Sequence, residues 1–393
     1  MSTKRTGAAS RHPAIPILYT FFVMGFCDIV GVATSYVKSD FGLSETMSGF
    51  IPSMVFLWFL LLSVPTALLM NKIGRKNTVQ LSNLFTFVGM IIPFFAYNFA
   101  TCMIAFVFLG IGNTMLQVSL NPLLSNVVRK EKLTSSLTGG QVIKAVSSFL
   151  GPFIAAFASI QLGNWKYLFP IYAFFTLLSA VSLLTTRMPE EDREIDKASG
   201  LKETFSLLSD KKILLLVLGI VFVVGVDVGT NTMAPKLLME RTGLALESAG
   251  LGSSVYFLAR TIGSFLGAFL LARLNDRKYF FYNILAAVAS VIVLVFVKDR
   301  AGILALLAMI GFTCSCLFSI IFSVAIKSRP EKANEISGLM ITGVCGGAVI
   351  PPLMGFMTDV MGSQNGSLLI IGICMLYLLF CSVKLKTLKS ISE

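Results

Sequence analysis

Long apolar runs recur along the whole 393-residue chain, and they limit its fold more than any other feature. A run of about 18 residues or more is long enough to cross a bilayer as a helix. Because lipid offers no hydrogen bonds to the backbone, a spanning segment must be a helix or part of a closed barrel. The runs here are continuous rather than alternating in polarity. The sequence therefore predicts an all-α membrane protein with twelve transmembrane helices.

The low charge content supports this prediction. Only 13% of the residues are charged and 55% are hydrophobic, whereas a soluble domain has about 25% charged residues. A net charge of +12 is also typical of nucleic-acid-binding proteins, but here the basic residues gather in the loops between the apolar runs. We therefore expect a bilayer, and no nucleic acid, around this chain.

Twelve spans in two similar halves are predicted, with a polar segment between them. The first half covers residues 1–187, the central loop 188–212 and the second half 213–393. The expected spans lie near 14–37, 47–70, 77–97, 100–124, 133–160, 165–187, 213–237, 247–273, 277–297, 301–327, 334–360 and 366–386. The central loop is interpreted as a plain linker, with a short amphipathic surface helix as the alternative.

The basic residues fall mostly on one side of these spans. Of the 32 Lys and Arg residues, 24 lie on the side of the termini and the central loop, and two lie inside spans. The six on the opposite side are Lys38, Lys166, Lys236, Arg241, Lys298 and Arg300. An excess of Lys and Arg marks the cytoplasmic loops of a membrane protein. Both termini are therefore predicted to be cytoplasmic.

The two halves also repeat short patterns at a nearly constant offset. Arg75 and Lys76 in the loop after the second span match Arg277 and Lys278 after the eighth. Gly42, Gly49 and Pro152 match Gly243, Gly250 and Pro352. Duplicated halves are typical of secondary transporters, whose substrate site lies at the midplane between them.

Four charged residues fall inside predicted spans: Asp28, Lys144, Asp227 and Arg260. A charge at the bilayer centre costs about 2.5–3.5 kcal/mol even on lenient scales, so it is usually paired and functional. The four charges sum to zero, which favours one ion pair in each half. Asp28 and Asp227 are the candidates for proton coupling, with Lys144 and Arg260 as their partners. Purely structural pairing is the alternative.

Amide side chains provide the candidate substrate site. Asn113, Gln117 and Asn121 share one face of the fourth span, and Asn231 follows Asp227 by four residues on the seventh. Gln141 in the fifth span is a further candidate. An amide donates and accepts hydrogen bonds at once, which suits sugar hydroxyls. Amides also hold helices together in membranes, and this alternative stays open.

A flexible segment is predicted in the eleventh span. Gly346 and Gly347 allow close packing, and Pro351 weakens the helix where it would bend. Glycines and a proline at matching places in the fifth span suggest paired hinges.

The loop after the second span reads ALLMNKIGRK and resembles the loop motif of the major facilitator superfamily. Lys72, Gly74, Arg75 and Lys76 fit that motif, and Arg277 lies in its second-half copy, while Asn71 replaces the family's acidic residue. The resemblance implies the major facilitator fold, with this motif stabilising one closed face of the carrier.

Within that superfamily the chain resembles the fucose–proton symporter family. The segments that carry the resemblance read QVSLNPLLSNV, VGVDVGTNT, ARTIGSFLGAFLL and GGAVIPPLMGFMTD. Three residues depart from the family pattern. Gln117 replaces a glutamate, Lys144 replaces an asparagine, and Asp28 lies about one turn before the family's acid. The first half thus loses one acid and gains one base.

The resemblance implies proton-coupled uptake of a monosaccharide across a bacterial inner membrane, by a monomer that alternates access to a midplane site. The main alternative is a carrier of an organic anion such as a sugar acid, with Lys144 binding the carboxylate. A membrane sensor is a third class, and it predicts an added signalling domain. No nucleotide-binding motif, metal cluster or catalytic constellation is visible, so we expect no cofactor, no metal and no enzymatic activity.

Overall fold

The computed structural model describes residues 14–128, 130–188, 205–271, 276–329 and 333–387. These residues are helical almost throughout, and no strand occurs among them. The expected all-α fold is confirmed. Residues 189–204 of the central loop lie outside the described residues, whereas its last part, 205–212, is described and contains the short 3₁₀ helix η3 (Leu207–Ser209).

The first half consists of six helical spans, four of which are single α-helices. The elements are α1 (Ala14–Met24), η1 (Gly25–Ile29), α2 (Val30–Phe41), α3 (Glu45–Ile73), α4 (Arg75–Phe95), α5 (Phe99–Val127), α6 (Lys130–Gln161), η2 (Trp165–Tyr167) and α7 (Leu168–Thr185). The 3₁₀ segment η1 interrupts the first span, so α1, η1 and α2 together form a single crossing.

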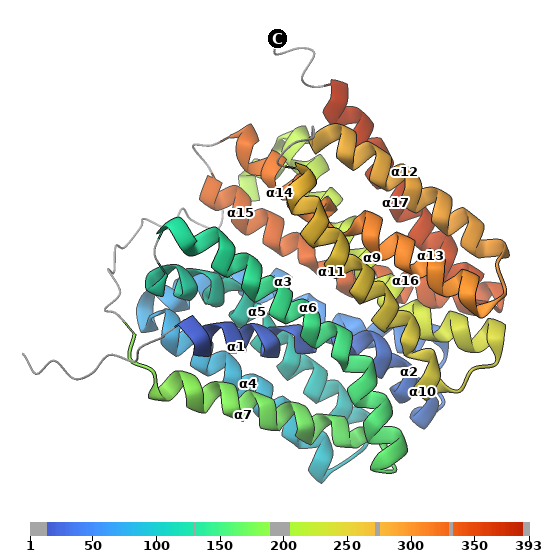
Figure 1. Cartoon of the computed structure of the whole chain (residues 1–393), viewed down its shortest axis with the longest axis horizontal. Coiled ribbons are helices and arrows are strands. Elements are labelled where there is room, and N and C mark those ends of the chain that lie inside the picture. The colour runs from blue at the N-terminus through green and yellow to red at the C-terminus, as the bar shows by residue number, and fades with distance from the viewer. Residues whose placement is uncertain (1–13, 129, 189–204, 272–275, 330–332, 388–393) are drawn as a thin grey trace, which may run out of the picture.

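The second half repeats this arrangement with more interruptions. Its elements are η3 (Leu207–Ser209), α9 (Lys211–Thr242), α10 (Leu246–Ala249), α11 (Leu251–Leu271), α12 (Asp276–Phe296), α13 (Arg300–Cys314), α14 (Leu317–Ser328), α15 (Ala333–Thr342), η5 (Gly343–Cys345), α16 (Gly346–Met361) and α17 (Asn365–Thr387). Figure 1 shows the blue-to-green helices of the first half and the yellow-to-red helices of the second half as two neighbouring bundles.

Eleven helical segments in the described residues are long and apolar enough to cross a membrane. The 21-residue helix α11 occupies the place of the remaining predicted span. Large apolar side chains such as Phe174, Leu184 and Phe296 are more than 60% exposed, as expected where lipid replaces water around the protein. The largest difference from prediction is in α9, which continues about one turn beyond the expected end, to Thr242.

Buried apolar side chains form one cluster in each half. One cluster draws on residues 17–183 with Val228, Val344 and Ala348 from the second half, and the other draws on residues 207–381. The seven cysteines are free, and six of them are buried among these side chains, which fits the packing role expected from the sequence.

The repeated glycines occupy equivalent places in the two halves. Gly42 and Gly243 end α2 and α9 with φ angles of 60° and 65°, a left-handed conformation that glycine adopts without strain. Gly49 of α3 lies against Pro351 of α16, and Gly250 lies against Pro152 of α6. Each contact crosses from one half to the other, so the repeated residues form two matching interfaces.

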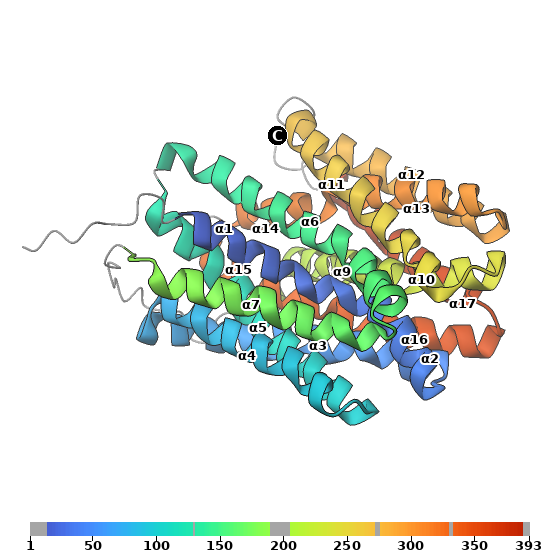
Figure 2. The ribbon, with the colours of Figure 1, turned by 60° about the horizontal axis from the view of Figure 1, so that its bottom comes forward.

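Contacts between the halves gather at one end of the bundle. At this end α2, α9 and α16 finish and α3, α10 and α17 begin. We call it the closed end. Figures 1 and 2 show α2, α10 and α16 gathered at this end, away from the start of α1. An ion pair there joins Glu45 of α3 to Lys236 of α9 across the two halves.

Candidate functional site

A carboxylate–guanidinium pair lies in the middle of the second half. Asp227 of α9 and Arg260 of α11 form an ion pair with an Oδ2–Nη2 distance of 2.9 Å. The Tyr256 hydroxyl, one turn before Arg260, donates a hydrogen bond of 2.6 Å to Asp227 Oδ1. Their side chains are 19% exposed for Asp227 and 32% for Arg260, and Tyr256 is fully buried. The ion pair expected in the second half is therefore present.

The acid of the first half has different partners. Asp28 lies in η1, where Ser148 Oγ of α6 donates a 2.5 Å hydrogen bond to its Oδ2. The neighbouring Cys27 thiol lies 3.5 Å from Oδ1. A hydroxyl and a thiol are neutral donors, so they do not balance the charge of the carboxylate.

The predicted ion pair between Asp28 and Lys144 is not formed, which corrects the expectation for the first half. Lys144 makes no ion pair with any carboxylate among the described residues, although it lies on α6 only one turn before Ser148. Ser148 and Cys27 already contact both oxygens of Asp28. The charges of the four residues inside the spans sum to zero, but this sum does not show which side chains form an ion pair. Asp28 and Lys144 still act electrostatically on Asp227, so the four groups share one region between the halves.

Two of the predicted amides form a chain to the first span. Asn113 of α5 is 1% exposed, and its Nδ2 donates a 2.7 Å hydrogen bond to the Met24 carbonyl. Gln117 Nε2 donates to Asn113 Oδ1 at 3.0 Å. Met24 immediately precedes η1, so this chain holds α5 to the point where the first span leaves α-helical geometry. Asn113 thus has a helix-joining contact, while Gln117 remains partly exposed.

The other two amides of the first half face open space. Asn121 of α5 and Gln141 of α6 are exposed, and neither makes a hydrogen bond to a described residue. Their amide groups have the donors and acceptors that a polyhydroxylated ligand would require.

Asn231 connects the two halves near the centre. Its Nδ2 donates a 2.7 Å hydrogen bond from α9 to the Asp28 carbonyl. The side chain fills the space that a Cβ would need at Gly31, so only glycine allows this approach. Asn231 is 2% exposed, and its Oδ1 has no hydrogen-bond partner. The amide predicted to read substrate therefore holds the backbone of the proton-coupling candidate.

Proline residues release backbone carbonyls that serine side chains then bind. Pro352 has no N–H for the Ala348 carbonyl four residues earlier, and Ser53 Oγ of α3 donates to that carbonyl at 2.5 Å. Pro235 releases the Asn231 carbonyl in the same way, and Ser253 Oγ donates to it at 2.9 Å. In lipid each such carbonyl requires a partner inside the protein.

The predicted hinge residues follow directly after an interruption of the eleventh span. α16 continues through Pro351 and Pro352, and the interruption is η5, just before Gly346. Gly346 lies against the backbone of Val221, and a Cβ at Gly347 would come 2.6 Å from the Phe56 ring. These glycines therefore allow α16 to approach its neighbours closely, while Ser53 compensates the carbonyl that Pro352 releases.

The residues of the loop motif bind helix ends within their own half. Gly74 joins α3 to α4 with a φ of 87°. Arg75 donates hydrogen bonds to the Asn126 side chain and, at 3.3 Å, to the Pro122 carbonyl near the end of α5. Lys76 donates a 2.7 Å hydrogen bond to the carbonyl of Thr186. Positive side chains at helix C-termini also favour the helix dipole.

The remaining motif residues are described less fully. Lys72 is exposed, Arg277 is partly buried near the start of α12, and the side chain of Asn71 lies outside the described residues.

Several residues of the site were not found from the sequence. Lys236, at the end of the span expected near 213–237, was counted with the charges on the non-cytoplasmic side, but it lies within α9 and its side chain is only 9% exposed. Tyr256 and Ser148 each lie four residues from a predicted charged residue on the same helix, and this spacing was the available signal. Glu45 gave no signal, because its partners come from three other helices.

Comparisons with known proteins agree with the fold of this chain. A "Putative glucose/galactose transporter" of Helicobacter pylori is 25% identical over 388 residues, covering 93% of this chain and 94% of that protein. The crystal structure of the Escherichia coli fucose:proton symporter aligns with 95% of this chain and 98% of its own, at a TM-score of 0.66 and 18% identity.

A second solved structure extends the likeness in fold. It is a bacterial homolog of the human lysosomal transporter Spinster, in an inward-facing and occupied conformation. It covers 96% of both chains at a TM-score of 0.77 and 17% identity. The sequence pattern of the Major Facilitator Superfamily matches residues 17–352 and 216–390. The chain therefore belongs to the Major Facilitator Superfamily and is a membrane carrier rather than an enzyme.

Proposed function

We propose that this carrier moves a neutral monosaccharide together with a proton across a bacterial inner membrane. The Helicobacter pylori relative, named for glucose and galactose, supports the substrate class. The Escherichia coli structure, named as a fucose:proton symporter, supports coupling to protons. The observation that carries the proposal is the pair of central acids, because only one of them has a cationic partner.

Asp28 is the group proposed to carry the proton. A buried carboxylate loses water, and a nearby cation compensates its charge. Asp227 has Arg260 at 2.9 Å, and this cation compensates its charge. Among the described residues, Asp28 contacts only the neutral Ser148 hydroxyl and Cys27 thiol, so no cation among them is bound to its carboxylate and it is the acid that we propose takes up and releases the proton. Asp227 stays a second candidate for proton coupling.

The substrate is proposed to lie beside these acids. Gln117, Asn121 and Gln141 present amide groups that are partly or fully exposed. Asn113 and Asn231 are proposed to position the first span beside the substrate, because each donates a hydrogen bond to a backbone carbonyl of that span. Alternating access follows if the half covering 1–187 rocks against the half covering 213–393 as a monomer, with 188–212 as the connection.

The excess of Lys and Arg on one side places both termini in the cytoplasm in this proposal. The closed end then faces outward. Arg75, Lys76 and Arg277 then lie at the cytoplasmic end, where Arg75 and Lys76 bind helix ends within the first half.

Uptake by purified protein in proteoliposomes tests the proposal. An imposed inward proton gradient should drive accumulation of labelled glucose or galactose in the parent protein. Asp28→Asn should abolish accumulation while exchange of sugar across the membrane continues. If Asp28→Asn and Asp227→Asn both leave gradient-driven accumulation intact, proton symport through these acids is wrong.

The second candidate function is the transport of an organic anion such as a sugar acid. It is favoured by one observation: Lys144 lies in the central region without an ion pair to any described carboxylate. A ligand carboxylate would complete such a pair. Competition of labelled glucose uptake by a uronate, compared between the parent and Lys144→Met, separates the two functions. Strong competition that disappears in Lys144→Met supports the anion carrier.

A further inference from the structure

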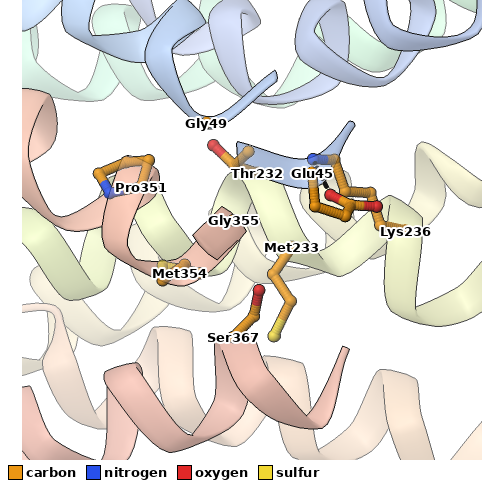
Figure 3. Close-up of a pocket in the computed structure, with 9 residues that line it drawn as sticks. All are labelled: Glu45, Gly49, Thr232, Met233, Lys236, Pro351, Met354, Gly355 and Ser367. Atoms are coloured by element: carbon orange, nitrogen blue, oxygen red, sulfur yellow. Dashed lines mark hydrogen bonds and ion pairs between the residues drawn. The ribbon is translucent and has the colours of Figure 1, made fainter. Parts of the chain in front are cut away.

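Charged side chains from both halves converge at the closed end. Glu45, at the start of α3, accepts hydrogen bonds from Lys38 at 2.6 Å and from Lys236 at 2.7 Å. Gln364 Nε2 adds a third bond of 3.0 Å to Glu45. Figure 3 shows Glu45 beside Lys236 at the edge of a small cavity that Thr232 also lines. We call Lys38, Glu45, Lys236, Gln364 and Asp359 the end clasp.

Asp359 adds a second link in the same place. Its carboxylate, from α16, accepts hydrogen bonds from the backbone N–H groups of Glu45 at 3.0 Å and Thr46 at 2.7 Å. These N–H groups belong to the first turn of α3, which has no helical partners for them. A negative charge at a helix N-terminus is also favourable. The second half therefore caps a helix of the first half.

Lys236 makes the clasp sensitive to separation of the halves. Its side chain is 9% exposed, and besides Glu45 it donates a 2.9 Å hydrogen bond to Ser48 Oγ. Both partners belong to the first half, whereas Lys236 belongs to α9 of the second. Removing one partner of a buried ion pair leaves an uncompensated charge, which is strongly unfavourable.

The equivalent position of the other interface lacks such a charge pair. Glu247 matches Glu45 at the offset that relates Arg75 to Arg277. Glu247 accepts a 3.0 Å hydrogen bond from Ser159 Oγ of the first half, but it makes no ion pair with any described residue. The two interfaces therefore share packing and differ in ionic contacts.

We propose that the contacts of the end clasp hold the two halves together at the closed end. Glu45 and Lys236 are then positioning residues that set how readily the carrier opens outward. The outward direction rests on the proposed function and its membrane orientation. Each cycle must break the Glu45–Lys236 and Asp359–α3 contacts and form them again. The clasp thus controls the step that admits substrate from outside, without contacting the substrate itself.

Chemical labelling of Thr232→Cys measures this opening without any substrate. Thr232 lines the cavity beside the clasp and is 4% exposed. A membrane-impermeant maleimide applied to sealed right-side-out vesicles should label it slowly in the parent. Glu45→Gln should raise the labelling rate about tenfold, equivalent to about 1.4 kcal/mol. The parent without the engineered cysteine, whose own cysteines are mostly buried, gives the background.

Two further variants separate a gate from a folding defect. Glu247→Gln is the matched control and should change the rate by less than about twofold. Combining Glu45→Gln with Lys236→Met removes both charges, so labelling should fall back toward the parent rate. The proposal is overturned if Glu45→Gln and Glu247→Gln behave alike, if the double variant labels as fast as Glu45→Gln alone, or if the faster labelling appears only in inside-out vesicles.

The result is independent of the transported compound. A change of labelling rate with no sugar-driven uptake supports the clasp and rejects sugar as the substrate. An unchanged labelling rate together with gradient-driven sugar uptake rejects the clasp and keeps the proposed function.

Discussion

The two halves of this carrier share their glycine packing at the closed end and differ in the charged contacts in the middle. Gly42 and Gly243 end equivalent helices with nearly the same φ angle. In the middle, Asp227 binds Arg260 and Tyr256, whereas Asp28 binds neutral Ser148 and Cys27.

This difference shows how a duplicated fold can divide two tasks. At the two interfaces, equivalent glycines lie against a proline of the opposite half. The central charges need not follow that symmetry, because each carboxylate is stabilised by its own neighbours. A compensated acid suits a fixed structural charge, and an uncompensated acid suits proton exchange.

The largest expected effect concerns the two acids themselves. Asp28→Asn should abolish gradient-driven accumulation, because its amide cannot bind and release a proton. Asp227→Asn should retain accumulation per folded molecule while lowering thermal stability, because Arg260 is left without its carboxylate. Accumulation ratios in proteoliposomes, normalised to folded protein, test this. The opposite pattern would assign the proton to Asp227.

The two central cations provide the next comparison. Arg260→Met should destabilise the protein toward the lower end of the about 3–5 kcal/mol expected for breaking a buried pair, since the pair is partly exposed. Lys144→Met should change stability by about 0.5 kcal/mol or less, because no ion pair is lost. Thermal unfolding in detergent measures both. Equal losses would contradict the difference between the halves.

The hydroxyl donors should show a smaller difference. Ser148→Ala removes the short hydrogen bond to Asp28, and hydrogen bonds to charged groups contribute about 1.5–3 kcal/mol. Tyr256→Phe should cost less, because Asp227 keeps Arg260. Ser147→Ala is the control, since the buried Ser147 hydroxyl has no hydrogen-bond partner. A loss in the control as large as in Ser148→Ala would argue against a specific contact. The measurement is again thermal unfolding.

The smallest expected effects lie at the matching glycines. A Cβ at Gly49 would come 2.5 Å from the Pro351 carbonyl oxygen, whereas one at Gly250 would come 3.3 Å from Pro152 Cβ. Gly49→Ala should therefore destabilise the protein by about 1–3 kcal/mol through overpacking, and Gly250→Ala by less. Melting temperatures of the two variants test this, and equal values would show that the interfaces tolerate bulk alike.

Local sequence features predicted the fold well. Apolar run length gave the spans because lipid permits few alternatives to a helix. Repeat offsets gave the matching glycines and prolines, since each half obeys the same packing rules. The hinge at Gly346, Gly347 and Pro351 stays a prediction. The 3₁₀ segment η5 just before Gly346 was not predicted, and α16 is continuous through Pro351.

The site was less predictable because its contacts depend on three-dimensional direction. Asp227 and Arg260 meet as expected, but Asp28 and Lys144 do not, although both pairs have opposite charges. Lys236 was counted with the charges outside the membrane because it lies close to the end of an apolar run. Only the fold shows that Glu45, from a distant helix, compensates its charge inside the protein.

The 3₁₀ segment η1 gives the first span a mechanical property. A 3₁₀-helix rises about 2.0 Å and turns about 120° per residue, against about 1.5 Å and 100° in an α-helix. Rewinding the five residues Gly25–Ile29 into α geometry would shorten the span by about 2.5 Å and rotate α2 by about 100° relative to α1. Asp28 lies inside η1, and Asn231 of the opposite half donates a hydrogen bond to its carbonyl. A change of helix type at η1 would therefore move α2 along its axis and rotate it relative to α1.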